Sequence, residues 1–434
     1  MRTIFLSLVL LSSMPLCILA QKVNTQAQYY AISKNGKYGY MDATGKIVIE
    51  LKFDDVNRYN DNAVYENNLF PVKSGSYWGY CNLKGEIIIP CRFADANPFK
   101  GGLALVRLTL ETAPDFTKNM AFIDISGKQV TQHNVYDHNS FGDMPMVKDG
   151  LIAIREFKTN KWGFLDTKGK VAIPFIYNYA MPFSEGLSVV QKGSLFGYID
   201  KSGKEVIGPQ YLTASSFKEN LAVVMKSTDS STFYFIDKSG KITGSTKLEL
   251  GGNLIEETRI AFYDGLCRFT KNGKTGLIDK TGKIVVEAIY DKIYYYMGEG
   301  HWLVKNEPPS RADTYSRTKG VKPAKTDDAK PAVTNAPLRK TGCGYIDNTG
   351  KLIMDIKYYD ARNYFYGFAA FCYEKDKWGV MDMTGKVIVE PIYKNDADIS
   401  AGGLIRMNGS NYYSGEFGYV DKNGKWIWPM PEIK

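Results

Sequence analysis

Histidine is the scarcest of the residues that carry chemistry here, with only 3 in 434 residues. His133 and His138 lie five residues apart in a polar stretch, which is typical of exposed loop histidines rather than of a metal site. No Gly-x-Ser-x-Gly sequence occurs, no glycine-rich phosphate loop is present, and no cysteine has a recognisable histidine partner. We therefore expect no enzyme activity, no catalytic residue, no cofactor and no metal.

Cysteine is also sparse, with 6 residues and no Cys-x-x-Cys pair, which argues against a zinc or redox motif. Five of them lie beyond the N-terminal segment, and an odd number leaves at least one thiol unpaired. Cys81 and Cys267 occupy an aliphatic and a small-residue position of the repeat described below. We expect both to be buried thiols.

The first twenty residues have the features of a secretory signal peptide. Arg2 supplies a positive charge, residues 4–11 are apolar, and Ala20 precedes a plausible cleavage point. The apolar stretch is short for a membrane span and is broken at Pro15. We expect cleavage after Ala20, no transmembrane span afterwards, and a secreted, periplasmic or cell-surface protein.

The composition favours strands and turns. Aromatic residues make up 13% of the chain, with 30 Tyr, and Gly is plentiful at 41 residues. Aromatic residues favour strands, and glycine favours the turns between them. The formal net charge of +9 falls to +8 without Arg2, and much of the excess comes from lysines at one repeated turn position. We expect no nucleic-acid partner.

One block of residues recurs ten times: aromatic, Gly, aromatic, aliphatic, Asp, x, x, Gly, Lys, then Ile or Val residues. Residues 162–166 and 196–200 are clear copies, whereas Ala121 and Tyr234 stand where the first glycine belongs in the third and sixth. The second glycine is present in all ten copies: Gly45, Gly85, Gly127, Gly169, Gly203, Gly240, Gly282, Gly350, Gly385 and Gly424. Such regularity indicates a tandem repeat protein.

The Asp-x-x-Gly sequence predicts a tight turn between two strands. Asp can accept hydrogen bonds from backbone N–H groups two residues on, and glycine adopts the left-handed conformation that closes the turn. The glycine between the aromatic residues allows another backbone or ring to approach closely. A single hairpin would be unstable in water, so neighbouring repeats must cover its apolar faces.

A second element follows each hairpin, in which an aromatic residue precedes a Gly or Asn by three positions and a short apolar strand comes next. Each unit therefore has about three strands in roughly 40 residues. Its aromatic residues include Phe99, Phe183, Phe217 and Tyr364. We expect an all-β protein built as a tandem β-hairpin repeat array, elongated or curved like a solenoid; the alternative is a closed β-propeller.

These motifs resemble the WG-repeat family, which is named for a Trp-Gly pair followed by an aromatic, an aliphatic, Asp-x-x-Gly-Lys and a Pro-aromatic element. Residues 78–79, 162–163 and 378–379 carry the pair itself. The resemblance covers roughly residues 37–430 apart from one insertion. It implies a bacterial secreted or cell-envelope protein with a binding or structural role, and it brings no catalytic residues.

The insertion divides the repeats. Residues 306–341 contain five prolines, many Lys, Thr and Ala, and almost no large apolar residue. Such a segment cannot bury enough surface to order itself, so we expect a disordered Pro/Lys-rich linker or exposed loop. The predicted organisation is a signal peptide over 1–20, repeats 1–7 over 21–305, this linker, and repeats 8–10 over 342–434.

Clusters of tyrosine are the candidate binding residues, because surplus tyrosines on an exposed face could stack on sugars or anchor a protein. Part of them should instead belong to the core. The candidates are Tyr294, Tyr295, Tyr296, Tyr364, Tyr366, Tyr412 and Tyr413. We expect a non-enzymatic secreted or cell-envelope protein that mediates protein–protein binding or scaffolding; the alternative is a cell-wall or glycan-binding repeat module.

Overall fold

The computed structural model describes ten segments of the chain: residues 28–56, 65–109, 120–131, 147–156, 158–250, 260–294, 299–307, 340–400, 402–408 and 417–428. The expected signal peptide lies outside them, as do Tyr295, Tyr296, Tyr412, Tyr413 and most of the 306–341 segment. The described residues hold 36 strands and one 3-10 helix, η1 (Glu66–Asn68). No helix among them is long and apolar enough to cross a membrane.

The strands of the first half form five antiparallel sheets. Three have three strands, one has four and one has seven. They contain β1 (Tyr29–Lys34), β2 (Lys37–Asp42), β3 (Ile47–Phe53); β4 (Asp55–Val56), β5 (Phe70–Ser74), β6 (Tyr77–Cys81), β7 (Ile87–Phe93); β8 (Asp95–Ala96), β9 (Leu103–Arg107), β10 (Met120–Asp124); β11 (Leu151–Glu156), β12 (Lys161–Asp166), β13 (Val171–Tyr177); and β14 (Tyr179–Ala180), β15 (Leu187–Lys192), β16 (Leu195–Asp200), β17 (Glu205–Ala214), β18 (Ala222–Lys226), β19 (Asp229–Ile236), β20 (Ile242–Thr246).

Four further sheets of four strands follow. They contain β21 (Glu249–Leu250), β22 (Leu266–Lys271), β23 (Lys274–Asp279), β24 (Ile284–Tyr290); β25 (Lys292–Ile293), β26 (Trp302–Asn306), β27 (Gly342–Ile346), β28 (Leu352–Tyr358); β29 (Asp360–Ala361), β30 (Phe368–Cys372), β31 (Trp378–Asp382), β32 (Val387–Tyr393); and β33 (Ala397–Ile399), β34 (Ile405–Asn408), β35 (Phe417–Val420), β36 (Trp426–Trp428). All the pairings are antiparallel between consecutive strands, so every sheet is a meander.

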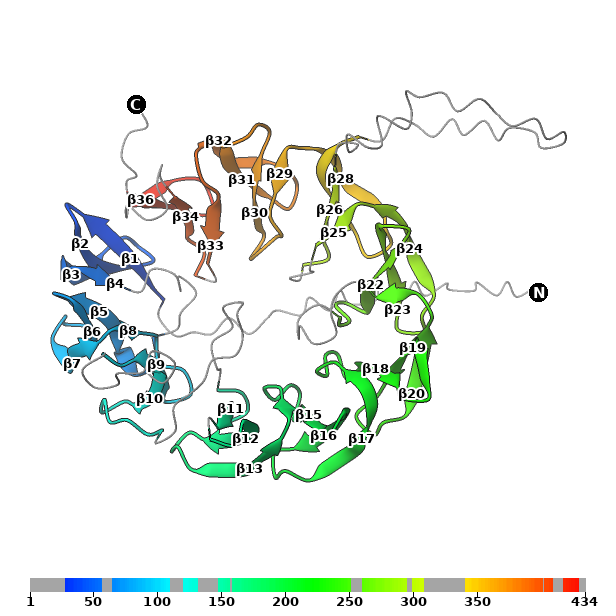
Figure 1. The fold of residues 1–434 in the computed structure, drawn as a ribbon. Helices are drawn as coiled ribbons and strands as arrows, with labels where there is room; N and C mark the ends of the chain where they lie inside the picture. Colours follow the sequence, from blue (N-terminus) through cyan, green and yellow to red (C-terminus); the bar gives the residue numbers. More distant parts are fainter. Residues whose placement is uncertain are drawn as a thin grey trace, which may run out of the picture.

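The sheet units, here called blades, are offset from the sequence repeats: each repeat supplies the third and fourth strands of one blade and the second strand of the next. The seven-stranded sheet is two consecutive blades that share the long strand β17, so the nine sheets make ten blades. In a complete blade the strand order is first, second, third and fourth, and the Asp-x-x-Gly turn joins the third strand to the fourth. Figure 1 places fourth strands such as β7, β13, β24 and β32 on the outside of the molecule.

The ten blades curve into a closed ring (Figure 1). The first and last blades meet in a core of their own, in which Tyr30 of β1 contacts Tyr419 of β35 with ring centroids 5.4 Å apart. No described strand is exchanged between these two blades, so side-chain packing closes the ring. The predicted all-β tandem repeat array is confirmed, and its curvature gives the propeller form rather than an elongated one.

Pairs of aromatic side chains connect blades at six of the junctions. The second aromatic residue of the motif packs on the aromatic residue that precedes the second strand of the following blade, as in Tyr198 with Phe217 at 4.8 Å. The Tyr198 hydroxyl also donates to the carbonyl oxygen of Ser215. Equivalent ring pairs are Tyr40–Tyr65, Tyr80–Phe99, Phe164–Phe183, Phe235–Phe262 and Tyr345–Tyr364. Such pairs each add about 0.5–1.5 kcal/mol beyond the burial of their area.

The glycine between the aromatic residues lies beneath a bulge of the fourth strand. In the fifth blade Phe196 pairs with Tyr211 but Tyr198 pairs with Ile207, so three residues of β17 pass over Gly197. A Cβ atom on Gly197 would lie 2.5 Å from the Ile207 carbonyl oxygen. The close backbone approach predicted at this glycine is therefore confirmed, and the motif needs glycine for space rather than for its backbone angles.

The Asp-x-x-Gly turns have the predicted hydrogen bonds. In the fifth blade Asp200 Oδ1 accepts hydrogen bonds from the Ser202 backbone N–H at 2.9 Å, the Ser202 hydroxyl at 2.6 Å and the Lys204 N–H at 3.1 Å. Gly203 closes the turn with φ of +84° and donates to the Asp200 carbonyl oxygen. All ten turn glycines have φ between +73° and +93°.

The same turn glycine also rests on the preceding blade. A Cβ atom on Gly203 would lie 3.4 Å from the Ile173 side chain in the outer strand of the fourth blade. Gly45 of the first blade has this relation to Ile427 of the last, where the distance would be 3.0 Å. The contact therefore continues across the point where the ring closes, and one glycine meets both a turn requirement and a packing requirement.

The third and sixth blades depart from this geometry, as their sequences do. In the sixth, Tyr234 replaces the motif glycine and pairs in regular register with Ser245 of β20. The close approach moves to Gly244, whose Cβ would lie 2.5 Å from the Lys280 carbonyl oxygen of the next blade. In the third, where Ala121 replaces the glycine, the described part of the outer strand is reduced to a bridge between Ile123 and Gln129.

The insertion lies within one blade. Strands β26 and β27 pair directly, with Asn306 opposite Gly342 and Trp302 opposite Ile346. The segment 307–341 therefore connects two neighbouring strands of the eighth blade, and the blades on either side of it belong to one continuous ring (Figure 1).

The cysteines beyond the N-terminal segment all lie in the described residues, and none forms a disulfide there. Cys81 and Cys267 are buried, as predicted. Burial raises the pKa of both thiols to about 12. They fill the core and are uncharged at neutral pH.

The bulge makes a prediction about two glycines of the fifth blade. Gly197→Ala should destabilise the fold by about 3 kcal/mol, since the added methyl group would overlap a backbone carbonyl. Gly193→Ala should cost only about 1–2 kcal/mol, because its φ of +66° is strained for alanine but nothing lies within 4 Å of the new Cβ. Denaturant unfolding of both variants measures the difference, and equal losses would contradict this account of the motif.

The carboxyl groups of the Asp-x-x-Gly turns should make the fold less stable in acid. The neighbouring hydroxyl, together with backbone N–H groups, holds the pKa of each turn carboxyl below its ordinary value of 3.8 at Asp42, Asp124, Asp200, Asp237 and Asp347. The unfolded chain then binds more protons in acid, so the stabilisation is complete above about pH 4 and falls as these groups protonate.

Asparagine at these turns should keep the geometry and reduce the pH dependence. Asn82, in the second blade, already accepts hydrogen bonds from the Lys84 and Glu86 N–H groups at 2.9 and 3.1 Å. The double variant Asp200→Asn/Asp237→Asn should therefore lose less thermal stability between pH 5 and pH 2.5 than the parent protein, with pH values chosen to bracket the carboxyl titration. Parallel melting-temperature curves for the two proteins would refute the assignment.

Candidate functional site

The tyrosines predicted as binding residues fall into different environments. Tyr364 is 1% exposed; its ring packs on Tyr345, and its hydroxyl donates to the Asp382 carbonyl oxygen at 3.1 Å. Burial raises its pKa well above the ordinary value. It belongs to the core between blades eight and nine. Tyr294 is half-buried against the same core, and burial also raises its pKa.

Tyr366 is the exposed member of the described candidates, at 43%. It occupies the first position of a two-residue turn between Phe365 and Phe368, where its φ is +52°. An aromatic residue in this conformation is unusual, since such turns favour Gly, Asn and Asp. Other blades have acidic residues there, at Asp149, Glu185, Glu219, Asp264 and Glu299.

Those acidic residues fasten one blade to the next. The Glu185 carboxylate accepts a hydrogen bond from the Asn220 N–H of the following blade at 3.0 Å and pairs with Lys238 at 3.3 Å. The Glu219 carboxylate repeats the arrangement with the Gly265 N–H and Lys280. Glu299 accepts from the Gly367 N–H, directly after Tyr366. The turn that contains Tyr366 is therefore bonded to Glu299 of the eighth blade, but Tyr366 has no carboxylate with which to bond the tenth blade in the same way.

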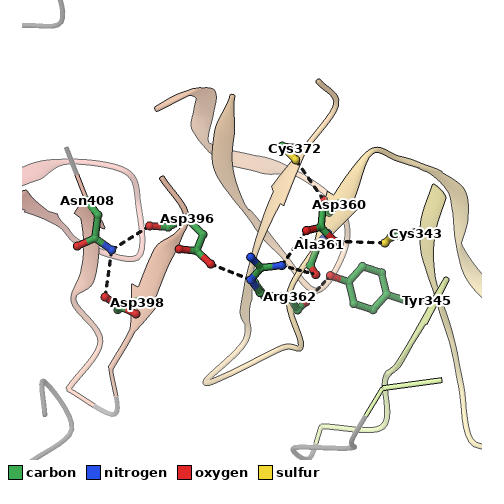
Figure 2. Close-up of polar contacts among 9 residues, drawn as sticks. All are labelled: Cys343, Tyr345, Asp360, Ala361, Arg362, Cys372, Asp396, Asp398 and Asn408. Atoms are coloured by element: carbon green, nitrogen blue, oxygen red, sulfur yellow. Dashed lines mark hydrogen bonds and ion pairs between the residues drawn. The ribbon is translucent and has the colours of Figure 1, made fainter. Parts of the chain in front are cut away.

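A polar network joins blades eight, nine and ten (Figure 2). Arg362, just after β29, donates from Nε to Asp396 at 2.7 Å and from Nη1 to Asp360 at 3.0 Å, and its guanidinium lies 4.4 Å from the ring centroid of Trp378. Its carbonyl oxygen accepts a hydrogen bond from the Tyr345 hydroxyl of the eighth blade. One guanidinium is therefore paired with two carboxylates.

The network continues on both sides of Arg362 (Figure 2). Asn408 Nδ2 donates to the Asp396 carbonyl oxygen and to an Asp398 carboxylate oxygen. The thiols of Cys343 and Cys372 lie against Asp360, at 3.7 Å from Oδ1 and 3.6 Å from its carbonyl oxygen. Burial raises their pKa values, to about 12 for Cys343 and about 11 for Cys372.

These groups act as a clamp between blades. The cation is balanced by carboxylates, and both thiols keep their protons at neutral pH, so neither is prepared as a nucleophile. Within the part of the chain that the structure describes, no three His, Cys, Asp or Glu side chains come together in an arrangement that could hold a metal ion.

The outer strands expose aliphatic side chains that the sequence analysis did not single out. They lie near the start of the fourth strand in the first, second, fourth, fifth, sixth and eighth blades, and near its end in the fourth, seventh and ninth. They are Ile47, Ile87, Ile88, Val171, Ile176, Val206, Ile242, Ile289, Leu352, Ile353 and Ile392, here called the rim residues. The sequence could have indicated these residues, because Ile and Val follow the repeated turn and the strand that they form lies at the edge of its sheet.

The clamp predicts that lysine cannot replace Arg362. Lysine lacks the planar fork that reaches both Asp360 and Asp396 while stacking on Trp378. Because the Arg362 side chain is 45% exposed, we expect Arg362→Lys to cost only about 1 kcal/mol, and less in 1 M salt. Arg107→Lys is the matched control, since Arg107 bonds Asp95 at similar exposure, and it should cost close to nothing. Equal effects of both changes on the unfolding midpoint would contradict the clamp.

Solved structures with some likeness to this chain share little of its sequence. A eukaryotic initiation factor matches with 11% identity and a TM-score of 0.48, covering 93% of this chain and 95% of its own. BamB from Moraxella catarrhalis has 10% identity and a TM-score of 0.35, and the match covers 73% of this chain and 93% of its own. Hsv2p from Kluyveromyces lactis has 10% identity and a TM-score of 0.30, and the match covers 55% of this chain and 71% of its own. These TM-scores are too low to support an argument about function.

No curated protein matches the sequence. A model of the WG containing repeat does match it seven times, over residues 38–77, 78–109, 162–195, 196–227, 276–307, 344–377 and 378–407. The matches leave out three repeats: the two in which Ala121 and Tyr234 replace the motif glycine, and the last one, which starts at Phe417. Because they cover more than half of the chain, this protein belongs to the family of WG containing repeats.

Proposed function

We propose that the protein is an exported, non-enzymatic scaffold that binds a protein partner through the outer rim of its ring. The observation that carries the proposal is the recurrence of the rim residues at equivalent positions of several outer strands. Single exposed aliphatic residues are ordinary on protein surfaces, but repeated and adjacent ones are typical of interaction sites.

The form of the outer strands supports contact through side chains rather than through added strands. Apart from β17, which two blades share, each described outer strand is the free edge of its sheet. Several outer strands contain a proline, namely Pro90, Pro174, Pro209 and Pro391. Proline interrupts the row of N–H groups that a further strand would need. A partner would therefore pack against the aliphatic side chains on a backbone held rigid by the bulges and turns.

Two consecutive rim residues lie in the outer strand of the second blade, next to the third blade. Ile88 is 50% exposed and Ile87 nearly as much, both at the start of β7. Ile125 is also exposed, in the turn whose Gly127 rests on Ile89 of the same strand. Three exposed isoleucines thus lie on the two segments, the start of β7 and the turn over residues 124–127, that meet where these blades pack together.

Export is supported by the N-terminal sequence, where a charged residue, an apolar stretch and a small residue stand in the order of a signal peptide. A binding role rather than a catalytic one is supported by the polar groups of blades eight to ten, because their hydrogen bonds and ion pairs hold these blades together. We therefore propose that the ring acts by binding through its surface.

The rim can be tested by capture from cell-envelope fractions. Ile88→Glu/Ile125→Glu should abolish recovery of a partner that the parent protein retains, because burying two unpaired carboxylates in the interface is costly. Lys128→Ser, an exposed change in the same turn, should leave recovery intact. Recovery of no specific protein by the parent, or an unaffected partner in the double variant, would count against the proposal.

A further inference from the structure

We propose that the ninth blade carries a saccharide-binding site, independent of the isoleucine group on the second and third blades. The site is a shallow pocket of about 320 Å³ lined by Tyr373, Glu374, Lys377, Pro391 and Ile392. The first three residues come from the loop between β30 and β31, and the last two from the outer strand β32. The sequence analysis named none of them.

Tyr373 forms an aromatic platform. Its ring stacks on Tyr358 with centroids 5.5 Å apart and planes inclined by 29°, and it forms a T-shaped pair with Phe371 at a centroid distance of 5.2 Å. Both supporting rings are buried, whereas Tyr373 is 47% exposed. One side of the ring is therefore held by the core and the remainder faces solvent, which fixes its orientation at small entropic cost.

The polar groups beside this ring suit hydroxyl groups. The Glu374 carboxylate and the Lys377 ammonium form an ion pair at 2.7 Å, and both side chains are largely exposed. A carboxylate accepts and an ammonium donates, so together they can bond adjacent hydroxyls of a sugar. The C–H face of the same sugar can pack on Tyr373, with Pro391 and Ile392 as further apolar wall.

The pocket depends on a feature of this blade. Its loop between the second and third strands spans five residues, 373–377, whereas the equivalent turns of the first and seventh blades are Asn35-Gly36 and Asn272-Gly273. The longer loop places Tyr373 and the ion pair over the outer strand. Because the pocket lies near the small end of ligand sites and is open to solvent, it suits one or two units of a longer chain.

Titration calorimetry with defined oligosaccharides tests the proposal on the purified full-length protein. The probes are tetramers of β-1,4-linked N-acetylglucosamine, β-1,4-linked glucose and α-1,4-linked glucose. We expect at least one to bind. Tyr373→Ala should weaken that binding at least about tenfold, whereas Tyr373→Phe should stay within about twofold, because the ring face and not the hydroxyl makes the contact.

Two further variants separate binding from folding. Tyr77→Ala removes another exposed tyrosine at the corresponding hairpin of the second blade and should leave binding unchanged. Glu374→Gln keeps the shape of an exposed side chain, so it should leave the unfolding midpoint in place while weakening binding several-fold. The proposal is overturned if no tetramer binds with a Kd below about 10 mM, which we take as the weakest affinity worth assigning to a site. It is also overturned if Tyr373→Ala binds a tetramer as tightly as the parent protein does.

Discussion

Contact between one blade and the next is the constraint on which the rest of the structure depends. A three- or four-stranded blade leaves apolar side chains on both faces, and only a neighbour can cover them. The ring pairs Tyr80–Phe99, Phe164–Phe183 and Tyr198–Phe217 have centroids 4.8 to 5.0 Å apart, so these three junctions are built alike. Nine junctions between consecutive blades carry the chain round the ring, and the tenth brings Tyr30 of the first blade against Tyr419 of the last. Closure of the ring therefore depends on the packing at every junction.

Local chemistry is the part of this structure that the sequence predicts most sharply. Asp200 and Gly203 form the expected turn because the interactions concerned lie within five residues of each other. Closure of the ring could not be predicted in the same way, since it depends on a rotation per blade that no single residue encodes. The position of the insertion was equally hidden, because only the pairing of Asn306 with Gly342 shows that it connects two strands of one blade.

The candidate tyrosines show where sequence reasoning needed one more step. Tyr364 aligns with Phe99, Phe183 and Phe217, which occupy the junction between blades, and that alignment already marks it as a core residue. Tyr366 lacks such an alignment, since acidic residues hold its position in other blades. Tyr373 is recognisable only from the unusual length of its loop. Departure from the repeat, more than tyrosine content, therefore indicates which residues are free of a structural task.

This division of labour bears on where function can reside. The turn glycines and junction aromatics are each committed twice, to their own blade and to a neighbour, so changes there disturb two blades at once. The exposed side chains of the outer strands and the loops between second and third strands have no such double commitment. The eighth blade keeps its strand pairing across an insertion of more than thirty residues, and the ninth keeps its pairing around a longer loop. A ring built in this way can vary its rim and its hairpin loops without altering its closure, and binding properties can therefore differ from blade to blade on a common frame.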